Sequence, residues 1–189
     1  MGRVAQEQGY GYWFARSKGY TGWLAAIDGR LEEGRTLLQE ELSEHAASGI
    51  LLFVPYTKAM LADVHARMGE PELALAVIGE ALDICARTGE AWVESELHRQ
   101  KGELLRADAS AAETCFRRAI EIASAQSAKL FELRASVSLA RLWREHGRGE
   151  EAHALLAPIH AWFTEGFDAP DLMEATALLD ELAPPLVAG

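Results

Sequence analysis

The sequence is short of the residues that build sheets, disulfide frameworks and membrane spans. It contains 7 Val, 7 Ile and 7 Thr against 33 Ala and 25 Leu, so strand-favouring residues are scarce and good helix formers are abundant. It has two cysteines and no CxxC pair, which excludes a disulfide framework and a thiolate zinc site and is typical of a reducing cytoplasm. The longest uninterrupted apolar run, Ile50 to Pro55, is far below the ~20 residues that span a bilayer. We therefore expect an all-α protein with no membrane partner.

Positive charge is scarce as well. Eighteen Lys and Arg against 29 Asp and Glu give a net charge of −11, which repels polyphosphate and argues against nucleic acid as a partner. The N-terminus has no apolar signal core, and Gln6 stands where a myristoylation signal requires Ser or Thr. A composition that is 49% apolar and 25% charged is nevertheless globular. These features predict a folded cytoplasmic protein.

A long sequence period, of the length found in helical repeat families, runs through the chain. Small residues recur in alternate helical segments, with steps of 40, 40 and 38 in the numbering: Gly22, Ala62, Gly102 and Ala140. The segments between them carry a second set with similar steps: Gly34, Ala74, Ala112 and Ala152. A third column is apolar apart from its first member: Glu41, Ala81, Ala119 and Ile159. Turn glycines recur at Gly29, Gly69 and Gly147. We interpret each unit as two helices that meet at small residues, where their axes approach closely.

The period predicts a single domain over residues 1–189. Its helix pairs are expected at about 4–48, 50–88, 90–126 and 128–165, followed by a capping helix at 170–182. A lone helix pair cannot cover its apolar face, so the pairs must stack into a right-handed α-solenoid. Pro158 lies inside the last pair, where it removes a backbone donor and should kink the helix or end it early.

This column pattern resembles the tetratricopeptide repeat (TPR). Leu61-Ala62 and Leu139-Ala140 match the paired leucine and small residue of the first helix, Gly69 matches the turn, and Ala74 lies in the second-helix signature. The sequence departs from the family in its longer period, roughly 40 residues instead of about 34, and in lacking the consensus tryptophan of the first helix. The resemblance implies a TPR-like scaffold that binds a protein or peptide.

A narrower resemblance covers residues 101–120, 132–143 and 162–168. These segments are similar to the C-terminal repeat region of bacterial signal-transduction ATPases, which are often fused to a class III adenylate or guanylate cyclase domain. In such proteins the repeats form the sensing or partner-binding arm. The sequence contains no GxxxxGK[ST] phosphate loop, so no ATPase or cyclase activity is carried over. The resemblance implies the non-catalytic, regulatory arm of a bacterial signalling regulator.

The TPR resemblance also implies a concave groove, lined by first-helix positions six before, three before, one after and four after the small residue. The candidate groove residues are Arg16, Trp23, Tyr56, Asp63, Glu96, Arg99, Glu103, Arg134, Arg141 and Arg144. The last three gather positive charge, and an arginine fork binds carboxylate or phosphate groups. The alternative is that these arginines only pair with glutamates of adjacent helices. Trp23 and Tyr56 are candidate anchors for an apolar side chain, whereas Trp13, Trp92, Trp143 and Trp162 are expected to pack in the core.

Few residues suggest chemistry. His146, His153 and His160 are spaced by seven, about 10.5 Å along a helix axis, which is too far apart to share one metal ion. No HExxH or GxSxG motif occurs. We therefore expect no enzyme activity, cofactor or metal. The favoured function is a protein- or peptide-binding scaffold, and the alternatives are a self-associating module, because an oligomer is compatible with the sequence, or a small-anion receptor at the arginines.

Overall fold

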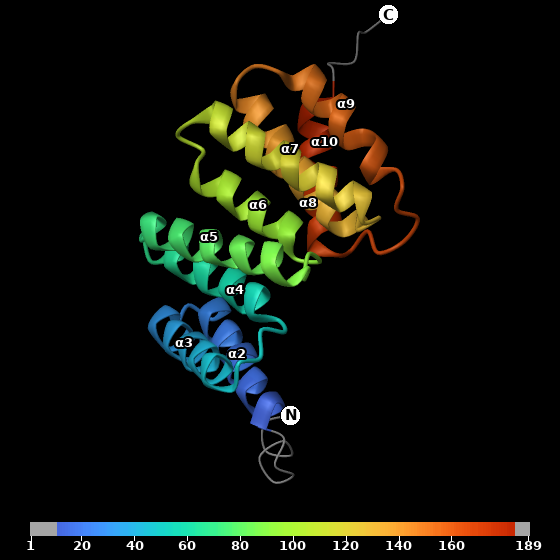
Figure 1. Ribbon diagram of the computed structural model, residues 1–189. Helices are drawn as coiled ribbons and strands as arrows, with labels where there is room; N and C mark the ends of the chain where they lie inside the picture. Colours follow the sequence, from blue (N-terminus) through green and yellow to red (C-terminus); the bar gives the residue numbers. More distant parts are fainter. Residues whose placement is uncertain (1–10, 184–189) are drawn as a thin grey trace, which may run out of the picture. The chain divides into compact units, whose positions relative to one another are not determined.

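The computed structural model describes residues 11–183, and every regular element in that range is an α-helix (Figure 1). The predicted all-α class is therefore confirmed. The chain divides into two compact units between Val93 and Glu94. Unit 1 contains α2 (Gly11–Ile27), α3 (Leu31–Ser48), α4 (Val54–Arg67) and α5 (Pro71–Thr88). Unit 2 contains α6 (Glu94–Leu104), α7 (Ala109–Ala125), α8 (Lys129–Glu145), α9 (Gly149–His160) and α10 (Pro170–Leu182).

The helices occur where the period places them. Each expected pair corresponds to two helices, and α10 has the bounds expected for the capping helix; residues 4–10 of the first expected pair lie outside the described residues. Gly29, Gly69 and Gly147 have φ values of 86°, 77° and 75°, a left-handed conformation that glycine adopts without steric cost. The third turn lacks this glycine, and there Asp108 caps α7 by accepting from the backbone N–H groups of Ser110 and Ala111.

Unit 1 is built on a close crossing of α2 and α3. A Cβ atom added at Gly22 would lie 2.8 Å from the Leu37 Cβ and 2.9 Å from the Gly34 carbonyl oxygen, so the two backbones touch there. Helix α3 packs on α4, which packs on α5. Buried apolar side chains of α2, α3 and α4 form the core, namely Ala26, Leu38, Met60, Leu61 and Val64. The small-residue columns thus mark helix contacts, as predicted.

Unit 2 repeats this arrangement and adds a fifth helix. The Phe116 ring lies directly against the backbone of α6, because a Cβ atom added at Gly102 would be 2.5 Å from it. Helix α8 packs on α6, α7, α9 and α10. Helix α10 contributes three buried residues to the core, Leu172, Ala175 and Leu178. Helix α9 ends at His160, two residues after Pro158, which agrees with the early end expected from that proline.

The tryptophans correct one expectation. Trp143 is buried in the core of unit 2, as predicted. Trp13, Trp92 and Trp162 are instead more than a third exposed. Trp13 lies on the side of α2 opposite Gly22, the residue at which α2 meets α3, because nine residue steps along a helix make about two and a half turns. An aromatic residue at helical spacing therefore did not identify a core position in this chain.

Candidate functional site

Arg16 is not a groove residue. Its side chain is 1% exposed and forms an ion pair with Glu41, which is fully buried. It also donates a 2.8 Å hydrogen bond to the Thr57 hydroxyl, and its guanidinium carbon lies 4.7 Å from the centroid of the Tyr20 ring. The structure thus places Arg16 inside unit 1, among α2, α3 and α4, where it serves the fold.

Glu41 explains why Arg16 is buried. Glu41 is the charged member of the otherwise apolar third column, so its carboxylate enters the interior with the rest of that column. Gly19 provides the space, because a Cβ atom there would overlap the Glu41 Oε2. Burial raises the pKa of the Glu41 carboxyl, and the positive charge of Arg16 opposes that rise. The charged residue Glu41 in an otherwise apolar column of the repeat was therefore the feature of the sequence that indicated a buried partner of opposite charge.

The other unit 1 candidates lie near the surface. Trp23 and Tyr56 are half-buried and pack against the core. The Tyr56 ring centroid is 5.1 Å from that of Trp92, whose indole N–H donates to Glu90. Asp63 lies 3.8 Å from Arg67, one turn later on α4. The structure therefore brings Tyr56 together with Trp92, a contact that the sequence analysis missed because the two rings are far apart along the chain.

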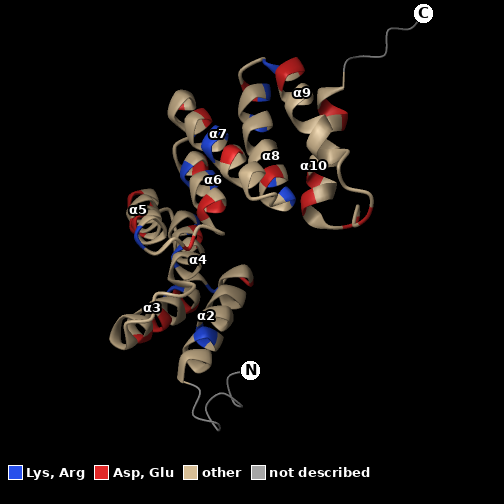
Figure 2. Cartoon of the chain, turned by 45° about the vertical axis from the view of Figure 1, so that its right-hand side comes forward, with Lys and Arg blue, Asp and Glu red and all other residues tan. Residues whose placement is uncertain are grey.

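The three arginines of α8 each face an acidic residue of α10. Arg134 donates to both carboxylate oxygens of Asp171, at 2.7 and 2.9 Å. The other two pairs are Arg141 with Glu174 and Arg144 with Glu181. Figure 2 shows basic residues on α8 and acidic residues on α10, its neighbour. The positive cluster expected from the sequence is thus balanced by α10, whose acidic residues the sequence analysis did not include.

The pairing continues between α6 and α8. Arg99 is bonded to Glu96 within α6, and Glu103 accepts a 2.6 Å hydrogen bond from the Ser138 hydroxyl of α8. Arg106, in the turn that follows α6, donates to both carboxylate oxygens of Glu145 on α8 at 2.7 Å. We call four ion pairs together the ion-pair ladder: Arg106–Glu145, Arg134–Asp171, Arg141–Glu174 and Arg144–Glu181. The six unit 2 candidates therefore lie on α6 and α8, two helices in contact with each other.

The arginines of the ladder are partly exposed. The side chains of Arg134, Arg141 and Arg144 are 38%, 43% and 39% exposed. Ion pairs at that exposure are worth roughly 0–1 kcal/mol, because water screens them and ordering two long side chains costs entropy. Breaking one of these pairs would therefore cost the fold little. The ladder is therefore a candidate site for binding a carboxylate.

A second cluster surrounds Trp143 in unit 2. The guanidinium carbons of Arg148 and Arg117 lie 4.4 and 5.1 Å from the Trp143 ring, and Glu113 accepts hydrogen bonds from both arginines. These residues line a pocket of about 490 Å³ beside the start of α7. Burial alone would raise the pKa of Glu113, but the hydrogen bonds and charges of its partners, Arg117 and Arg148 among them, outweigh it and hold the pKa below the usual value.

Replacing Glu113 with glutamine should lower the free energy of unfolding at pH 7 by about 1–2 kcal/mol, because two arginines lose a charged acceptor. A carboxyl whose folded-state pKa is depressed stabilises the fold above its unfolded pKa, and that stabilisation is lost as the pH falls through the folded pKa. The difference between the wild type and Glu113→Gln should therefore shrink below about pH 4. Urea unfolding at pH 7 and pH 3.5, followed by circular dichroism, measures it.

Glu121→Gln is the matched control on the same helix. Glu121 is 66% exposed and pairs only with Arg118, so its replacement should leave the free energy of unfolding nearly unchanged at both pH values. Equal effects of the two substitutions would contradict the stabilising role of Glu113.

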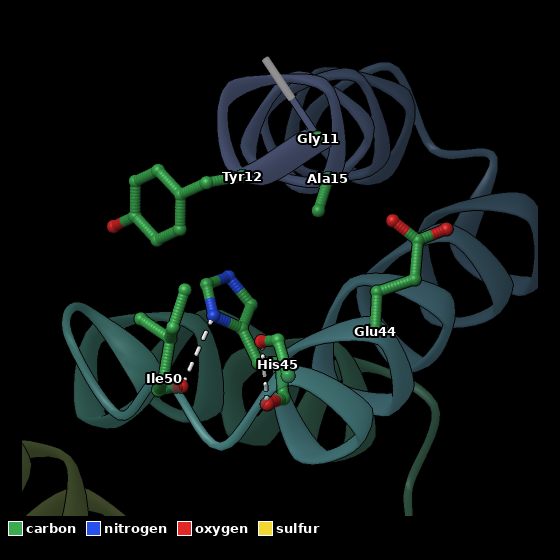
Figure 3. Close-up of a pocket in the computed structure, with 7 residues that line it drawn as sticks. Gly11, Tyr12, Ala15, Glu44, His45 and Ile50 are labelled. Atoms are coloured by element: carbon green, nitrogen blue, oxygen red, sulfur yellow. Dashed lines mark hydrogen bonds between the residues drawn. The ribbon is translucent and has the colours of Figure 1, made fainter. Parts of the chain in front are cut away.

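Unit 1 has a smaller pocket, of about 280 Å³, between the first turn of α2 and the end of α3 (Figure 3). The Tyr12 and His45 rings meet edge to face in it at 5.3 Å between centroids. The His45 Nδ1 lies 3.3 Å from the Ile50 carbonyl oxygen, and Glu44 is paired with Lys18. The His45 Nε2 also lies 3.4 Å from the Glu41 Oε1, so the pocket borders the buried Arg16–Glu41 pair.

Neither metal-binding clusters nor spanning helices occur in residues 11–183. No group of three His, Cys, Asp or Glu side chains in this range is arranged to hold a metal ion. None of the helices described combines the length and the apolarity needed to cross a membrane.

Comparison with known proteins finds similarity at the level of structure. No protein-family model and no curated protein matches the sequence. Among solved structures, a protein from Podosopora anserina described as a kinesin light chain with nearly identical TPR-like repeats superposes with a TM-score of 0.66 at 18% identity, over 88% of this chain and 84% of that one. BtubC (BKLC) from P. vanneervenii gives a TM-score of 0.66 at 16% identity, over 90% of this chain and 66% of that one.

These similarities agree with the helix pairs seen within each unit. At identities of 18% and 16% they establish a shared fold and leave activity and partners open. The protein therefore has an all-helical, TPR-like repeat fold of the α-solenoid class.

Proposed function

We propose that this protein binds a segment of a partner protein on the ion-pair ladder and has no catalytic activity of its own. The observation that supports the proposal is the state of the α8 arginines, which are paired and yet 38% to 43% exposed. Residues that serve only the fold, such as Arg16 and Glu41, are buried. The half-exposed arginines instead present N–H groups at the surface, where a partner can reach them.

The chemistry of the ladder favours an acidic partner segment. Arginine binds a carboxylate through two parallel N–H bonds, as Arg134 already does with Asp171. A partner carboxylate would replace an α10 acid in the same geometry. The net charge of −11 opposes the approach of an acidic segment elsewhere on the protein, so binding would be confined to the ladder.

The resemblance to the repeat arm of bacterial signalling regulators supports a regulatory role. The segments that carry this resemblance, residues 101–120, 132–143 and 162–168, all lie in unit 2, which also carries the ladder. On this proposal, ATP hydrolysis or cyclisation belongs to other domains, and this chain supplies the arm that detects a partner.

Arg141→Glu should weaken the binding of an acidic peptide at least tenfold. The substitution removes an N–H fork and adds a negative charge beside Glu174, so a peptide carboxylate would meet repulsion at that position. The probe is a fluorescently labelled decapeptide of alternating Asp and Leu, and its anisotropy is measured against protein concentration. A decapeptide of alternating Lys and Leu tests whether charge selects the ligand.

Arg118→Glu is the control for a general change in charge. Arg118 lies on α7, is 53% exposed and pairs with Glu121, so it matches Arg141 in residue type but lies outside the ladder. This variant should bind the acidic peptide as the wild type does, apart from a small screened effect. Equal loss in both variants, or binding of the Lys peptide and not the Asp peptide, would contradict the proposal.

A further inference from the structure

Helix α2 exposes an apolar stripe. Trp13, Tyr20, Leu24 and Ile27 are 47%, 44%, 60% and 55% exposed, respectively, and we call these four residues the α2 stripe. Single exposed apolar residues are ordinary, whereas several large ones along one helix indicate an interaction surface. Trp and Tyr are also the residue types most enriched among those that dominate binding energy at interfaces.

The stripe has the spacing of a coiled-coil seam. Its members are separated by seven, four and three residues, and at 3.6 residues per turn they fall within about 60° of one another. They lie on the side opposite Gly22, which is the residue where α2 touches α3. Helix α2 therefore has two apolar sides, one buried in unit 1 and one exposed, and an exposed apolar side of this kind is typical of a surface that another element covers.

The charge of α2 restricts what can cover the stripe. It is the only helix within residues 11–183 that has no acidic residue, although the whole chain carries a charge of −11 (Figure 2). Its two basic residues are occupied: Arg16 is buried on Glu41, and Lys18 pairs with Glu40 and Glu44. The stripe therefore offers nothing that selects an acidic or a basic partner. Among the described helices, α2 is also the one at which two strongly negative copies of the chain repel each other least.

We propose that a second copy of this chain covers the stripe, with the two α2 helices packed against each other across a two-fold axis. An uncharged seam with coiled-coil spacing is best complemented by another such seam, and each copy of the chain supplies one. A 17-residue helix is about 25 Å long, which buries less than the ~1,600 Å² of a standard interface. The dimer is therefore weak and dissociates on dilution. This self-association is independent of peptide binding at the ladder.

The test is the molar mass of the full chain by light scattering and sedimentation over a hundredfold range of concentration. The wild type should change from monomer towards dimer as the concentration rises. Leu24→Glu places a charge in the seam and should shift the midpoint at least tenfold, towards higher concentration. Because Leu24 is exposed, the helical circular dichroism should stay unchanged.

Leu73→Glu is the matched control. Leu73 lies on α5 of the same unit and is 50% exposed, so the same substitution changes charge and apolar area without touching the stripe. The Leu73→Glu variant should dimerise as the wild type does. If the wild type is monomeric at every concentration, the proposal is wrong, whatever else covers the stripe. It is also wrong if Leu73→Glu weakens the dimer as much as Leu24→Glu does. Leu24→Glu should bind the acidic peptide as the wild type does, because the stripe lies outside the ladder. Self-association and peptide binding are therefore tested independently.

Discussion

Replacing Glu41 with glutamine is expected to lower the free energy of unfolding by about 3–5 kcal/mol, the largest effect that we predict. The substitution keeps the shape of the side chain and removes its charge, so the Arg16 guanidinium, which is 1% exposed, is left without its counter-charge. An uncompensated charge in a low-dielectric interior is costly because water cannot solvate it. Urea unfolding at pH 7, followed by circular dichroism and tryptophan fluorescence, measures the loss.

Two controls separate the buried charge from other causes. Glu33→Gln breaks the ion pair between Glu33 and Arg30, two side chains that are each about half exposed. It should lower the free energy of unfolding by less than about 1 kcal/mol. The double variant Arg16→Met with Glu41→Leu removes both charges and should be more stable than Glu41→Gln alone, because no charge remains buried. A double variant less stable than the single one would contradict this account.

Gly22→Ala is expected to lower the free energy of unfolding by about 1–3 kcal/mol. Alanine favours the helix by about 1 kcal/mol over glycine, so local propensity alone predicts the opposite sign. The new methyl group would lie 2.9 Å from the Gly34 carbonyl oxygen, and a backbone atom cannot move aside by changing rotamer. The crossing of α2 and α3 would have to open, and thermal or urea unfolding detects the resulting loss.

Gly79→Ala is the matched substitution in the same unit. Gly79 lies within α5, and no atom outside its local helix lies within 4 Å of a Cβ added there, so the variant should gain about 1 kcal/mol from helix propensity. Opposite signs for these two Gly→Ala changes are the expected outcome. A stabilising Gly22→Ala would show that the crossing is looser than the backbone contacts indicate.

The helix pairs were predictable because local preferences and a repeated period specify them. The turn at Gly69 and the crossing at Gly22 follow from residue types that allow a left-handed backbone or a close approach. Helix α10 was likewise expected, although its partner residues were not. Its acidic residues Asp171, Glu174 and Glu181 come far along the chain from the arginines that they meet, and no local rule connects positions so distant in sequence.

The concave-groove positions expected from the TPR resemblance do not coincide with the exposed residues of α2. Those expected positions include Arg16 and Trp23 on α2, whereas the exposed stripe of that helix begins at Trp13 and includes Tyr20 and Leu24. Each residue step turns a helix by about 100°, so a small rotation about the axis exchanges surface positions for buried ones. A repeat period locates a helix along the chain without specifying that rotation.

The sequence by itself determined the all-α class, the helix pairs, their turns and the glycines at which helices cross, because these depend on propensity and spacing along the chain. Only the tertiary structure decided that Arg16 is buried on Glu41, that α10 balances the arginines of α8, and that α2 keeps an apolar side exposed. These outcomes depend on how each helix is rotated against its neighbours, which is set by packing between residues that are distant in the sequence.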